Sequence, residues 1–197
     1  YNPIYYSGEY INTPTALIEN NIYDMLQNSV TQTVVLDAKP LPELKSNAQF
    51  SYYLYERQSY HYYPSTLPKK QEGEGGEAYR GNEEVYRMNF EASATYDKTW
   101  NKTHHLDAVA VFTGYSYDQD IFSLRGKGYL IDSNLWNNMG AIQDKNTYTG
   151  SSSTKKITKM SAVARVNYNY KKRYYITVNG RYDGASNFAT NNKWGFF

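Results

Sequence analysis

Residues 160–183 alternate in polarity at nearly every position, and this pattern restricts the stretch to an extended conformation. Successive side chains of a β-strand point to opposite faces, so each half of the stretch has one apolar face and one polar face. Only residues 171–173 separate the two halves, which predicts a tight antiparallel hairpin. The apolar, small or aromatic side chains occupy the even positions: Met160, Ala162, Ala164, Val166, Tyr168, Tyr170, Tyr174, Ile176, Val178, Gly180 and Tyr182.

The tyrosines of this hairpin lie at the ends of its apolar face, and small or branched residues fill the middle. That distribution is typical of a sheet that crosses a membrane, with aromatic rings at the interface and a polar interior. A soluble β-sandwich also alternates, but its polar face looks outward to water. The hairpin alone therefore leaves both classes open, and the soluble sandwich is the commoner one.

The connections between predicted strands are alternately short and long. We expect strands over 23–37, 44–57, 86–97, 104–117, 160–170 and 174–183, with a seventh beginning at Lys193. The short connections are 38–43, 98–103 and 171–173, and the long ones are 59–84, 118–156 and 184–192. Outer-membrane barrels have short periplasmic turns and longer extracellular loops, whereas sandwiches have no reason to show this asymmetry. The alternation of lengths therefore favours the membrane barrel.

Two segments outside these strands have their own predicted character. Residues 1–22 are rich in Asn, Tyr, Pro and Ser, so we expect an irregular external segment. A helical turn is expected over 135–142 within the second long connection.

The composition narrows the class of protein further. The net charge of +2 is too small to indicate a nucleic-acid partner, and the absence of Cys excludes disulfides and thiolate metal sites. No apolar run approaches the roughly 18 residues of a membrane-spanning helix. The 23 Tyr are the unusual feature, and such rings suit membrane interfaces and sugar-binding surfaces alike.

The sequence offers no constellation for catalysis or for a cofactor. His104 and His105 are neighbours in a predicted strand, so they point to opposite faces and cannot share a metal ion. Asp118 and Asp120 have no complete set of oxygen ligands nearby, so a Ca²⁺ site is not predicted. No arrangement of nucleophile, base and acid is found, and we expect a protein that is not an enzyme and binds no cofactor or metal.

Aromatic side chains in the long connections are the candidate ligand contacts. Rings with polar edges stack on sugars, and such rings occur in both long connections. The candidates are Tyr60, Tyr62, Tyr63 and Trp136. The alternative is that each of them packs a loop or belongs to an aromatic belt.

Three motifs resemble one protein family in their order and spacing. Residues 181–188 read RYDGASNF and are followed by NNKWGFF over 191–197, which is similar to a run "R-x-D-G-S-S-x-F", a short polar loop and the first four positions of "W-G-x-F-P-S". Residues 96–108 read YDKTWNKTHHLDA and are similar to "Y-D-K-T-F…H-H-L-N-A". Residues 40–45 read PLPELK and are similar to a turn "L-P-x-x-x-G-L" without its Gly. The chain thus resembles the SusC/RagA-like TonB-dependent outer-membrane transporters of Bacteroidetes over most of residues 30–197.

This resemblance implies a fold and a function. The fold would be all-β, an antiparallel transmembrane β-barrel segment contributing about six to seven of roughly 22 strands. Residues 1–197 would be a partial barrel domain without signal peptide or plug, in the bacterial outer membrane. The protein would import oligosaccharides or peptides as part of a TonB-dependent transporter, with a SusD-like surface lipoprotein, the TonB complex and membrane lipid as partners.

Within that barrel, the polar side chains of the hairpin would face the lumen and form networks between strands, and would hold the plug. These side chains are Arg165, Asn167, Asn179, Arg181 and Asp183. The competing hypotheses are a soluble all-β glycan-binding module and a passive porin-like channel.

Overall fold

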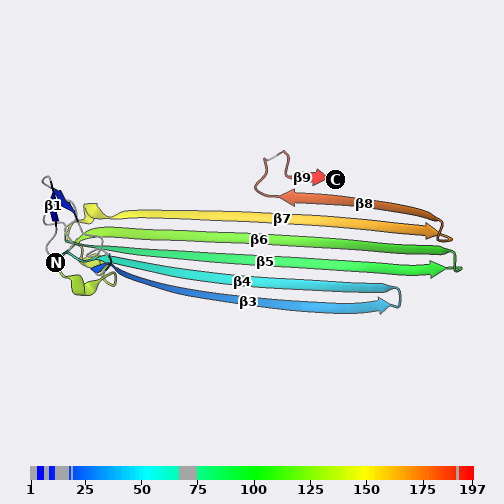
Figure 1. Cartoon of the computed structure of the whole chain (residues 1–197), viewed down its shortest axis with the longest axis horizontal. Coiled ribbons are helices and arrows are strands. Elements are labelled where there is room, and N and C mark those ends of the chain that lie inside the picture. The colour runs from blue at the N-terminus through cyan, green and yellow to red at the C-terminus, as the bar shows by residue number, and fades with distance from the viewer. Residues whose placement is uncertain (1–3, 7–8, 12–17, 19, 67–74, 190) are drawn as a thin grey trace. The chain divides into compact units, whose positions relative to one another are not determined.

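The computed structural model describes residues 4–6, 9–11, 18, 20–66, 75–189 and 191–197. Within them the chain forms one seven-stranded antiparallel sheet with the strand order β3-β4-β5-β6-β7-β8-β9, and a separate two-stranded sheet β1-β2. Sequential strands are neighbours throughout (Figure 1). The all-β, antiparallel fold predicted from the alternation is therefore confirmed.

The strands of the large sheet are long. Their bounds are Ile22–Leu41 for β3, Leu44–Tyr63 for β4, Gly76–Trp100 for β5, His104–Tyr129 for β6, Thr149–Tyr170 for β7, Tyr174–Ala185 for β8 and Trp194–Phe196 for β9. The small sheet consists of β1, Ile4–Tyr6, and β2, Glu9–Ile11. The expected irregular conformation of residues 1–22 is wrong for these two strands, and the residues between and beside them lie outside the described part.

The strands extend well beyond the ends predicted from periodicity. β5 begins at Gly76 and β6 runs on to Tyr129, so the connections predicted over 59–84 and 118–156 shrink to 64–75 and 130–148. These extensions were not predicted because charged residues, such as Glu84 and Asp118, occupy even positions where the strand pattern requires apolar residues. The connections remain longer than the tight turns that join β3 to β4, β5 to β6 and β7 to β8, as predicted.

The chain divides into two compact units. Unit 1 comprises 1–28, 55–84 and 120–154, and unit 2 comprises 29–54, 85–119 and 155–197. Strands β3 to β7 contribute residues to both units, while the tight turns belong to unit 2 and the two longer connections to unit 1.

Backbone hydrogen bonds tie the tight turns of unit 2 to one another. The Asp97 N–H donates to the Glu43 carbonyl at 2.9 Å, and the Lys171 N–H donates to the Thr103 carbonyl at 2.6 Å. The predicted turn over 38–43 is narrower than expected, because β3 continues through Pro40 to Leu41. Proline is tolerated there because β3 is the edge of the sheet, where a missing N–H breaks no inter-strand bond.

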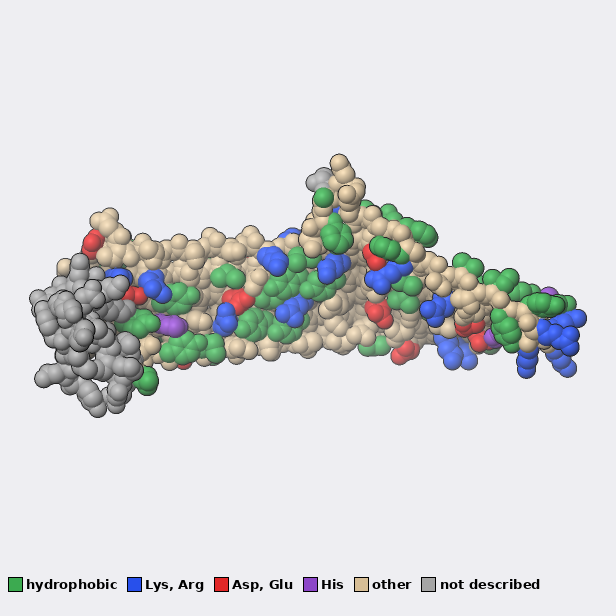
Figure 2. Space-filling model, turned by 45° about the horizontal axis from the view of Figure 1, so that its top comes forward, with side chains coloured by type: hydrophobic (Ala, Val, Ile, Leu, Met, Phe, Trp, Pro, Cys, Tyr) green, Lys and Arg blue, Asp and Glu red, His purple; other side chains and the backbone are tan. Residues whose placement is uncertain are grey.

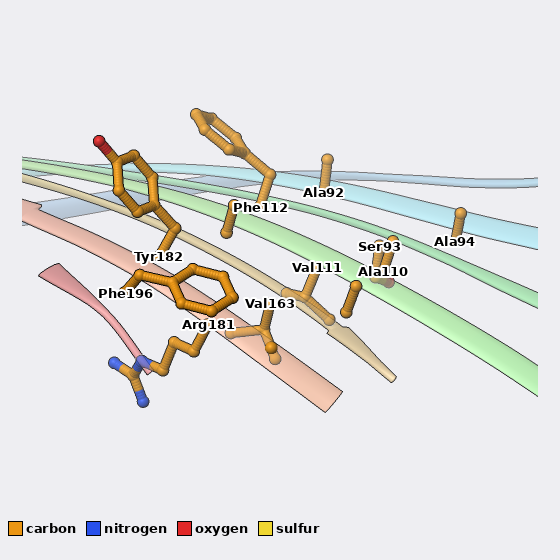
Figure 3. A pocket seen from close by; sticks show the side chains of 13 residues that line it. Ala92, Ser93, Ala94, Ala110, Val111, Phe112, Val163, Arg181, Tyr182 and Phe196 are labelled. Atoms are coloured by element: carbon orange, nitrogen blue, oxygen red, sulfur yellow. The ribbon is translucent and has the colours of Figure 1, made fainter. Parts of the chain in front are cut away.

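The register of the β7–β8 hairpin preserves the alternation. Met160 pairs with Gly184, Val166 with Val178 and Tyr170 with Tyr174, so apolar partners lie opposite each other on one face. Figure 3 shows the two faces directly: Ala92, Phe112 and Tyr182 point to one side of the sheet, and Arg181 points to the other. We call the side that carries the even-numbered residues of β4–β8 the apolar face, and the opposite side the polar face.

The apolar face of unit 2 is uncovered. Large apolar side chains on it are 38% to 64% exposed, and the buried hydrophobic residues of the described chain lie in unit 1, with Val85 as the exception. A single sheet layer cannot bury both of its faces, so this face needs a surrounding that the described residues do not supply. The exposed residues are Phe50, Met88, Phe90, Phe112, Met160, Val166, Ile176 and Val178.

Unit 1 has a small core of its own. Tyr62, Ala78, Tyr129, Met139 and Ile142 are buried and pack together. The last two come from the 130–148 connection, which contains the 3₁₀ turns η1 (Asp132–Asn134), η2 (Met139–Ala141) and η3 (Lys145–Thr147). The helical turn predicted over 135–142 is thus represented by η2. This connection is a folded element packed on β4–β6.

A left-handed glycine changes which side chain enters this core. Gly128 has φ +95°, a conformation that residues with a Cβ rarely adopt. The next residue, the odd-numbered Tyr129, then packs against the even-numbered Tyr62 with ring centroids 5.6 Å apart. The strict alternation of β6 therefore ends at Gly128.

No helix among the described residues is long and apolar enough to cross a membrane.

We predict that Gly126→Ala loosens the docking of residues 130–148. A Cβ at Gly126 would lie 2.5 Å from Ile142 Cδ1 and 2.9 Å from Tyr148 Cδ1, and Ile142 is fully buried and has no room to shift. Overpacking of this kind costs about 1–3 kcal/mol, so amide exchange over 130–148 should accelerate by about tenfold or more.

Gly114→Ala is the matched control, because it lies in the same strand and a Cβ there would meet only Phe90 Cβ at 3.9 Å. Equal exchange rates over 130–148 in the two variants would contradict the packing assigned to Gly126.

Candidate functional site

The four predicted ligand contacts do not lie together. Tyr60 and Tyr62 are even-numbered residues of β4, and the 130–148 connection packs on their side of the sheet. Tyr63 is odd-numbered, half-buried, and alternates to the other side. Tyr60 and Tyr62 therefore lie on the apolar face and Tyr63 on the polar face.

Tyr60 and Trp136 form a stacked pair. Their ring centroids are 5.3 Å apart with planes inclined by 17°, and the Arg80 guanidinium lies 5.3 Å from the Tyr60 ring centroid. The Tyr60 hydroxyl also donates to Gln58 Oε1 at 2.5 Å. Both rings are half-buried, and each covers one face of the other. A ligand could therefore reach only their edges and outer faces.

A cavity of about 400 Å³ lies beside this pair on the same side of the sheet. Met139 from the folded connection closes part of it. Its walls from β4, β5 and β6 are Glu56, Gln58, Tyr60, Arg80, Gly81, Asn82, Glu84, Phe122 and Leu124.

Tyr62 is part of the core of unit 1 and has no exposed surface. Its hydroxyl donates to Asp132 Oδ1 at 2.8 Å, and the same carboxylate accepts from the Ser65 N–H at 2.9 Å and from the Ser65 hydroxyl at 2.8 Å. Burial and the nearby carboxylate raise the pKa of Tyr62. The structure thus gives Tyr62 a structural role, fastening β4 to the 130–148 connection, and no access for a ligand.

The opposite side of unit 1 carries a cluster that the sequence pattern did not reveal. We call it the polar-face cluster: Tyr23, His61, Tyr79, Glu77 and Arg125, one or two side chains from each of β3 to β6. Tyr23 meets His61 edge-on at 4.5 Å, and His61 meets Tyr79 edge-on at 5.4 Å. The Arg125 guanidinium lies 5.7 Å from the Tyr79 ring and 3.3 Å from Glu77 Oε1.

The surroundings of His61 favour its neutral form. Partial burial and then the charge of Arg125 lower the pKa of His61 below its ordinary value. A neutral imidazole offers one hydrogen-bond donor and one acceptor beside two tyrosine rings. The polar-face cluster can therefore contact both apolar and hydrogen-bonding parts of a ligand.

A second aromatic–cation group lies on the polar face of unit 2. The Arg87 guanidinium is 4.8 Å from the Tyr53 ring centroid and 5.7 Å from that of Tyr117, so the group spans β4, β5 and β6. A planar guanidinium is well suited to packing between two rings. Because its contacts here are with ring faces, the group keeps its charge and donors for a ligand.

The polar network predicted for the hairpin is present in part. Asn167 donates to Asp107 at 2.8 Å and accepts from Thr177 at 2.9 Å, which links β6, β7 and β8. The Ser161 hydroxyl donates to Asp183, and Arg181 Nε lies 2.5 Å from Asp183 Oδ2. All of these side chains lie on the polar face, as their odd numbers require.

The histidine pair behaves as its position in a strand predicts. His104 Nδ1 is hydrogen-bonded to the Tyr168 hydroxyl at 2.6 Å, and His105 Nδ1 to the Thr99 hydroxyl at 3.0 Å, on opposite faces. Asp118 is paired with Lys156 at 3.2 Å. Among the described residues no group of three or more His, Cys, Asp or Glu is placed to hold a metal ion.

No family model matches the chain. Two curated relatives are TonB-dependent receptors of Formosa agariphila. The chain is 32% identical to TonB-dependent receptor P3 over 133 residues, which is 64% of the chain and 12% of the relative. It is 26% identical to TonB-dependent receptor P39 over 205 residues, 98% of the chain and 19% of the relative. The chain thus spans 12% to 19% of the length of these relatives.

The fold is similar to that of solved transport proteins. The structure of the RagAB peptide transporter superposes with a TM-score of 0.85 at 18% sequence identity, over 98% of this chain and 21% of that one. The RagAB peptide importer in its open-open state gives a TM-score of 0.84 at 18% identity with the same coverage. The resemblance to TonB-dependent transporters is confirmed by the relatives, and the barrel-type sheet by these structures.

We predict that docking of the 130–148 connection weakens in acid through Asp132. Burial acts to raise the pKa of Asp132, but hydrogen bonds from Ser65 and Tyr62 outweigh it, and the pKa is lowered below its ordinary value of 3.8. A carboxyl with a lowered pKa contributes stability above its unfolded pKa and loses it as the pH falls through the folded value. Protection of amides 130–148, corrected for intrinsic exchange, should be constant from pH 7 to about 5 and fall below about pH 4.

Asp132→Asn should remove this acid dependence and reduce protection at pH 7, because hydrogen bonds to a charged acceptor contribute about 1.5–3 kcal/mol. Asp144→Asn, in the same connection, is the control and should leave the acid dependence in place. A wild-type profile that is flat down to pH 3 would refute the role of Asp132.

Proposed function

We propose, from the likeness of this chain to the SusC/RagA-like TonB-dependent transporters, that it forms part of the wall of an outer-membrane β-barrel that imports nutrients. Residues 1–197 are a partial barrel domain, with the apolar face against lipid and the polar face toward the lumen. The plug and the TonB-contacting segment belong to other parts of such a protein. A SusD-like surface lipoprotein is the partner expected at its outer opening.

The observation that carries this proposal is a limited apolar band on one face of the sheet. In β7 the band runs from Met160 to Tyr170, about 33 Å along the strand. At the strand tilt of about 40° usual in barrels, that corresponds to about 25 Å of membrane, the height of the apolar band of outer-membrane barrels. A lipid surrounding explains why these side chains are exposed.

The band has limits on the other strands too. Beyond it the even-numbered positions become polar or charged, where each strand would leave the membrane. The first such residues are Glu56 in β4, Glu84 in β5, Ser116 in β6 and Thr158 in β7. The opposite limit is aromatic: Tyr96, Trp100, His104, Tyr168, Tyr170 and Tyr174.

The polar face supplies the candidate substrate contacts. The polar-face cluster and the Arg87 group combine rings with cations and hydrogen-bonding groups, which suits oligosaccharides and peptides alike. The likeness of the fold to a peptide transporter favours peptides. Of the four residues singled out in the sequence, we retain Tyr63 as a lumenal contact, because Tyr60 and Trp136 lie on the opposite side and Tyr62 is buried.

The soluble glycan-binding module is the weaker hypothesis. A β-sandwich buries its apolar face against a second sheet. Among the described residues the only other sheet is the two-stranded β1-β2, which is too small to cover the exposed apolar face of unit 2.

Membrane fractionation of the full-length natural protein tests the proposed function. We expect it in the outer-membrane fraction, extracted only by detergent, with a gel mobility that shifts on boiling because barrels resist unfolding in the cold detergent. Release as a soluble protein without such a shift would refute the barrel.

We predict that Ala164→Arg impairs barrel assembly and that Val163→Arg does not. The two residues are neighbours in β7 and point to opposite faces. An Arg that faces lipid at mid-membrane costs about 2–4 kcal/mol, whereas lumenal positions accept polar groups. The measurement is the fraction of protein that shows the heat-dependent mobility shift, and equal fractions for both variants would contradict the assignment of faces.

We predict that Arg87→Gln lowers nutrient uptake with little effect on assembly. The variant removes the charged donors that the group offers to a ligand, and a hydrogen bond to a charged group contributes about 1.5–3 kcal/mol, so the KM for uptake should rise by about tenfold or more. Uptake of labelled casein peptides and of labelled oligosaccharide mixtures would be compared.

Arg80→Gln is the matched control, because Arg80 makes a similar contact with Tyr60 on the other side of the sheet. An equal defect in both variants would show that Arg87 has no special position toward the substrate.

A further inference from the structure

We infer that the turns after β5 and β7 form a docking surface for the phosphate headgroups of anionic phospholipids. The turns are residues 101–103 and 171–173. The inference rests on the proposed barrel, and it adds a lipid preference that the barrel alone does not require.

The two turns and the end of β5 bring five cations together, four of them in the turns. The Lys171 N–H donates to the Thr103 carbonyl, so the two turns are in direct contact. Figure 2 shows Lys and Arg side chains gathered at the end of the sheet where the turns lie. The cations are Lys98, Lys102, Lys171, Lys172 and Arg173.

Two acidic side chains at this end of the sheet, Glu43 and Asp97, offset part of this charge, and Asp97 lies 4.0 Å from His105 Nδ1. Glu43 pairs with Lys98 at 2.9 Å, and the hydrogen bond between them lowers the pKa of Glu43 and raises that of Lys98. Lys102, Lys171 and Lys172 lie in the turns themselves and are exposed. The surface at the turns therefore carries an excess of positive charge.

Both turns place lysine at backbone conformations that are unfavourable for residues with a Cβ. Asn101 and Lys102 have φ values of +50° and +58°, and Lys171 and Lys172 have +53° and +54°. Two consecutive positive φ angles are the signature of a tight hairpin turn in which Gly and Asn are strongly preferred. Lysine is disfavoured there because its Cβ crowds the backbone. Glycine would suit three of these positions better, and lysine occupies them instead.

The turn after β7 holds its lysines in place through its neighbours. The Lys171 ammonium lies 5.1 Å from the Tyr170 ring centroid. The Lys172 N–H donates to Asn169 Oδ1, and its carbonyl accepts from the Tyr175 hydroxyl, both at 3.1 Å. Contacts with Asn169, Tyr170 and Tyr175 therefore stabilise the turn that carries Lys171 and Lys172.

A lipid surface is the occupant that fits this setting. The aromatic rings that end the apolar face, among them Trp100, Tyr170 and Tyr174, are of the kind that lie at headgroup level in barrels. The cations follow directly after these rings in the chain, where phosphate groups would be within reach. Cations next to an anionic membrane surface each strengthen binding by about fivefold.

The test replaces Lys102, Lys171 and Lys172 by Gly in the full-length protein. Wild-type protein and variant are reconstituted into nanodiscs of mixed phosphatidylglycerol and phosphatidylcholine, and the lipids retained after detergent extraction are counted by mass spectrometry. We expect the preference of the wild type for phosphatidylglycerol to fall by about tenfold or more. The temperature of the gel-mobility shift should stay the same or rise, because glycine relieves the turns.

Two control variants test whether the lipid preference depends on the positive charge of these three residues. Replacing the same three residues by Arg should retain the preference, and replacing Lys127 and Lys145, which lie well beyond the apolar band, by Gln should leave it unchanged. The inference is overturned if the glycine variant keeps the preference or if the arginine variant loses it. A wild-type protein that fails to insert and shows no mobility shift refutes the proposed barrel instead.

Discussion

The structure depends on the difference between the two faces of one sheet. The described strands form a single layer, so no second layer among the described residues shields the apolar side chains of unit 2 from their surroundings. In water, each of these partly exposed apolar residues would forgo a part of the roughly 1.5–3 kcal/mol that full burial of such a side chain contributes. Placed in lipid on one side and against polar groups on the other, the same sheet satisfies both faces. The alternation in the sequence therefore specifies the secondary structure and, in the proposed barrel, gives each face a surrounding that suits it.

The strands continue past the apolar band because other interactions replace lipid there. In unit 1 the even side of β4–β6 is covered by the folded 130–148 connection, with Ile142 and Met139 in its core. The other side is held by pairs across strands, such as Arg57 with Glu83 at 2.6 Å. Asp132, bonded to both Tyr62 and Ser65, joins the connection to the end of β4. This explains how polar stretches that look like loops remain regular strands.

The sequence pattern predicted features that depend on neighbouring residues of one strand, but not contacts between residues far apart in the chain. The hairpin over 160–183 and the order of short and long connections follow from periodicity within each strand, and the structure agrees with them. The extension of β5 back to Gly76 was missed, since its charged residues break the apolar pattern and some of them, Glu77 and Glu83, pair with residues of neighbouring strands. Tyr62 is hydrogen-bonded to Asp132, 70 positions away, and the contacts of Tyr79 with His61 and Arg125 join three strands. No signal within one strand reveals these neighbours.

The polar face also sets the register that makes the apolar face continuous. A shift of one residue between β7 and β8 would move every side chain of a strand to the other face. It would place Arg165 or Arg181 against lipid, at a cost of about 2–4 kcal/mol for each near mid-membrane. It would also break the bonds of Asn167 with Asp107 and Thr177 and that of Ser161 with Asp183. In the proposed barrel, the cost of placing charge in lipid and the loss of polar pairs therefore both oppose the same shift in register.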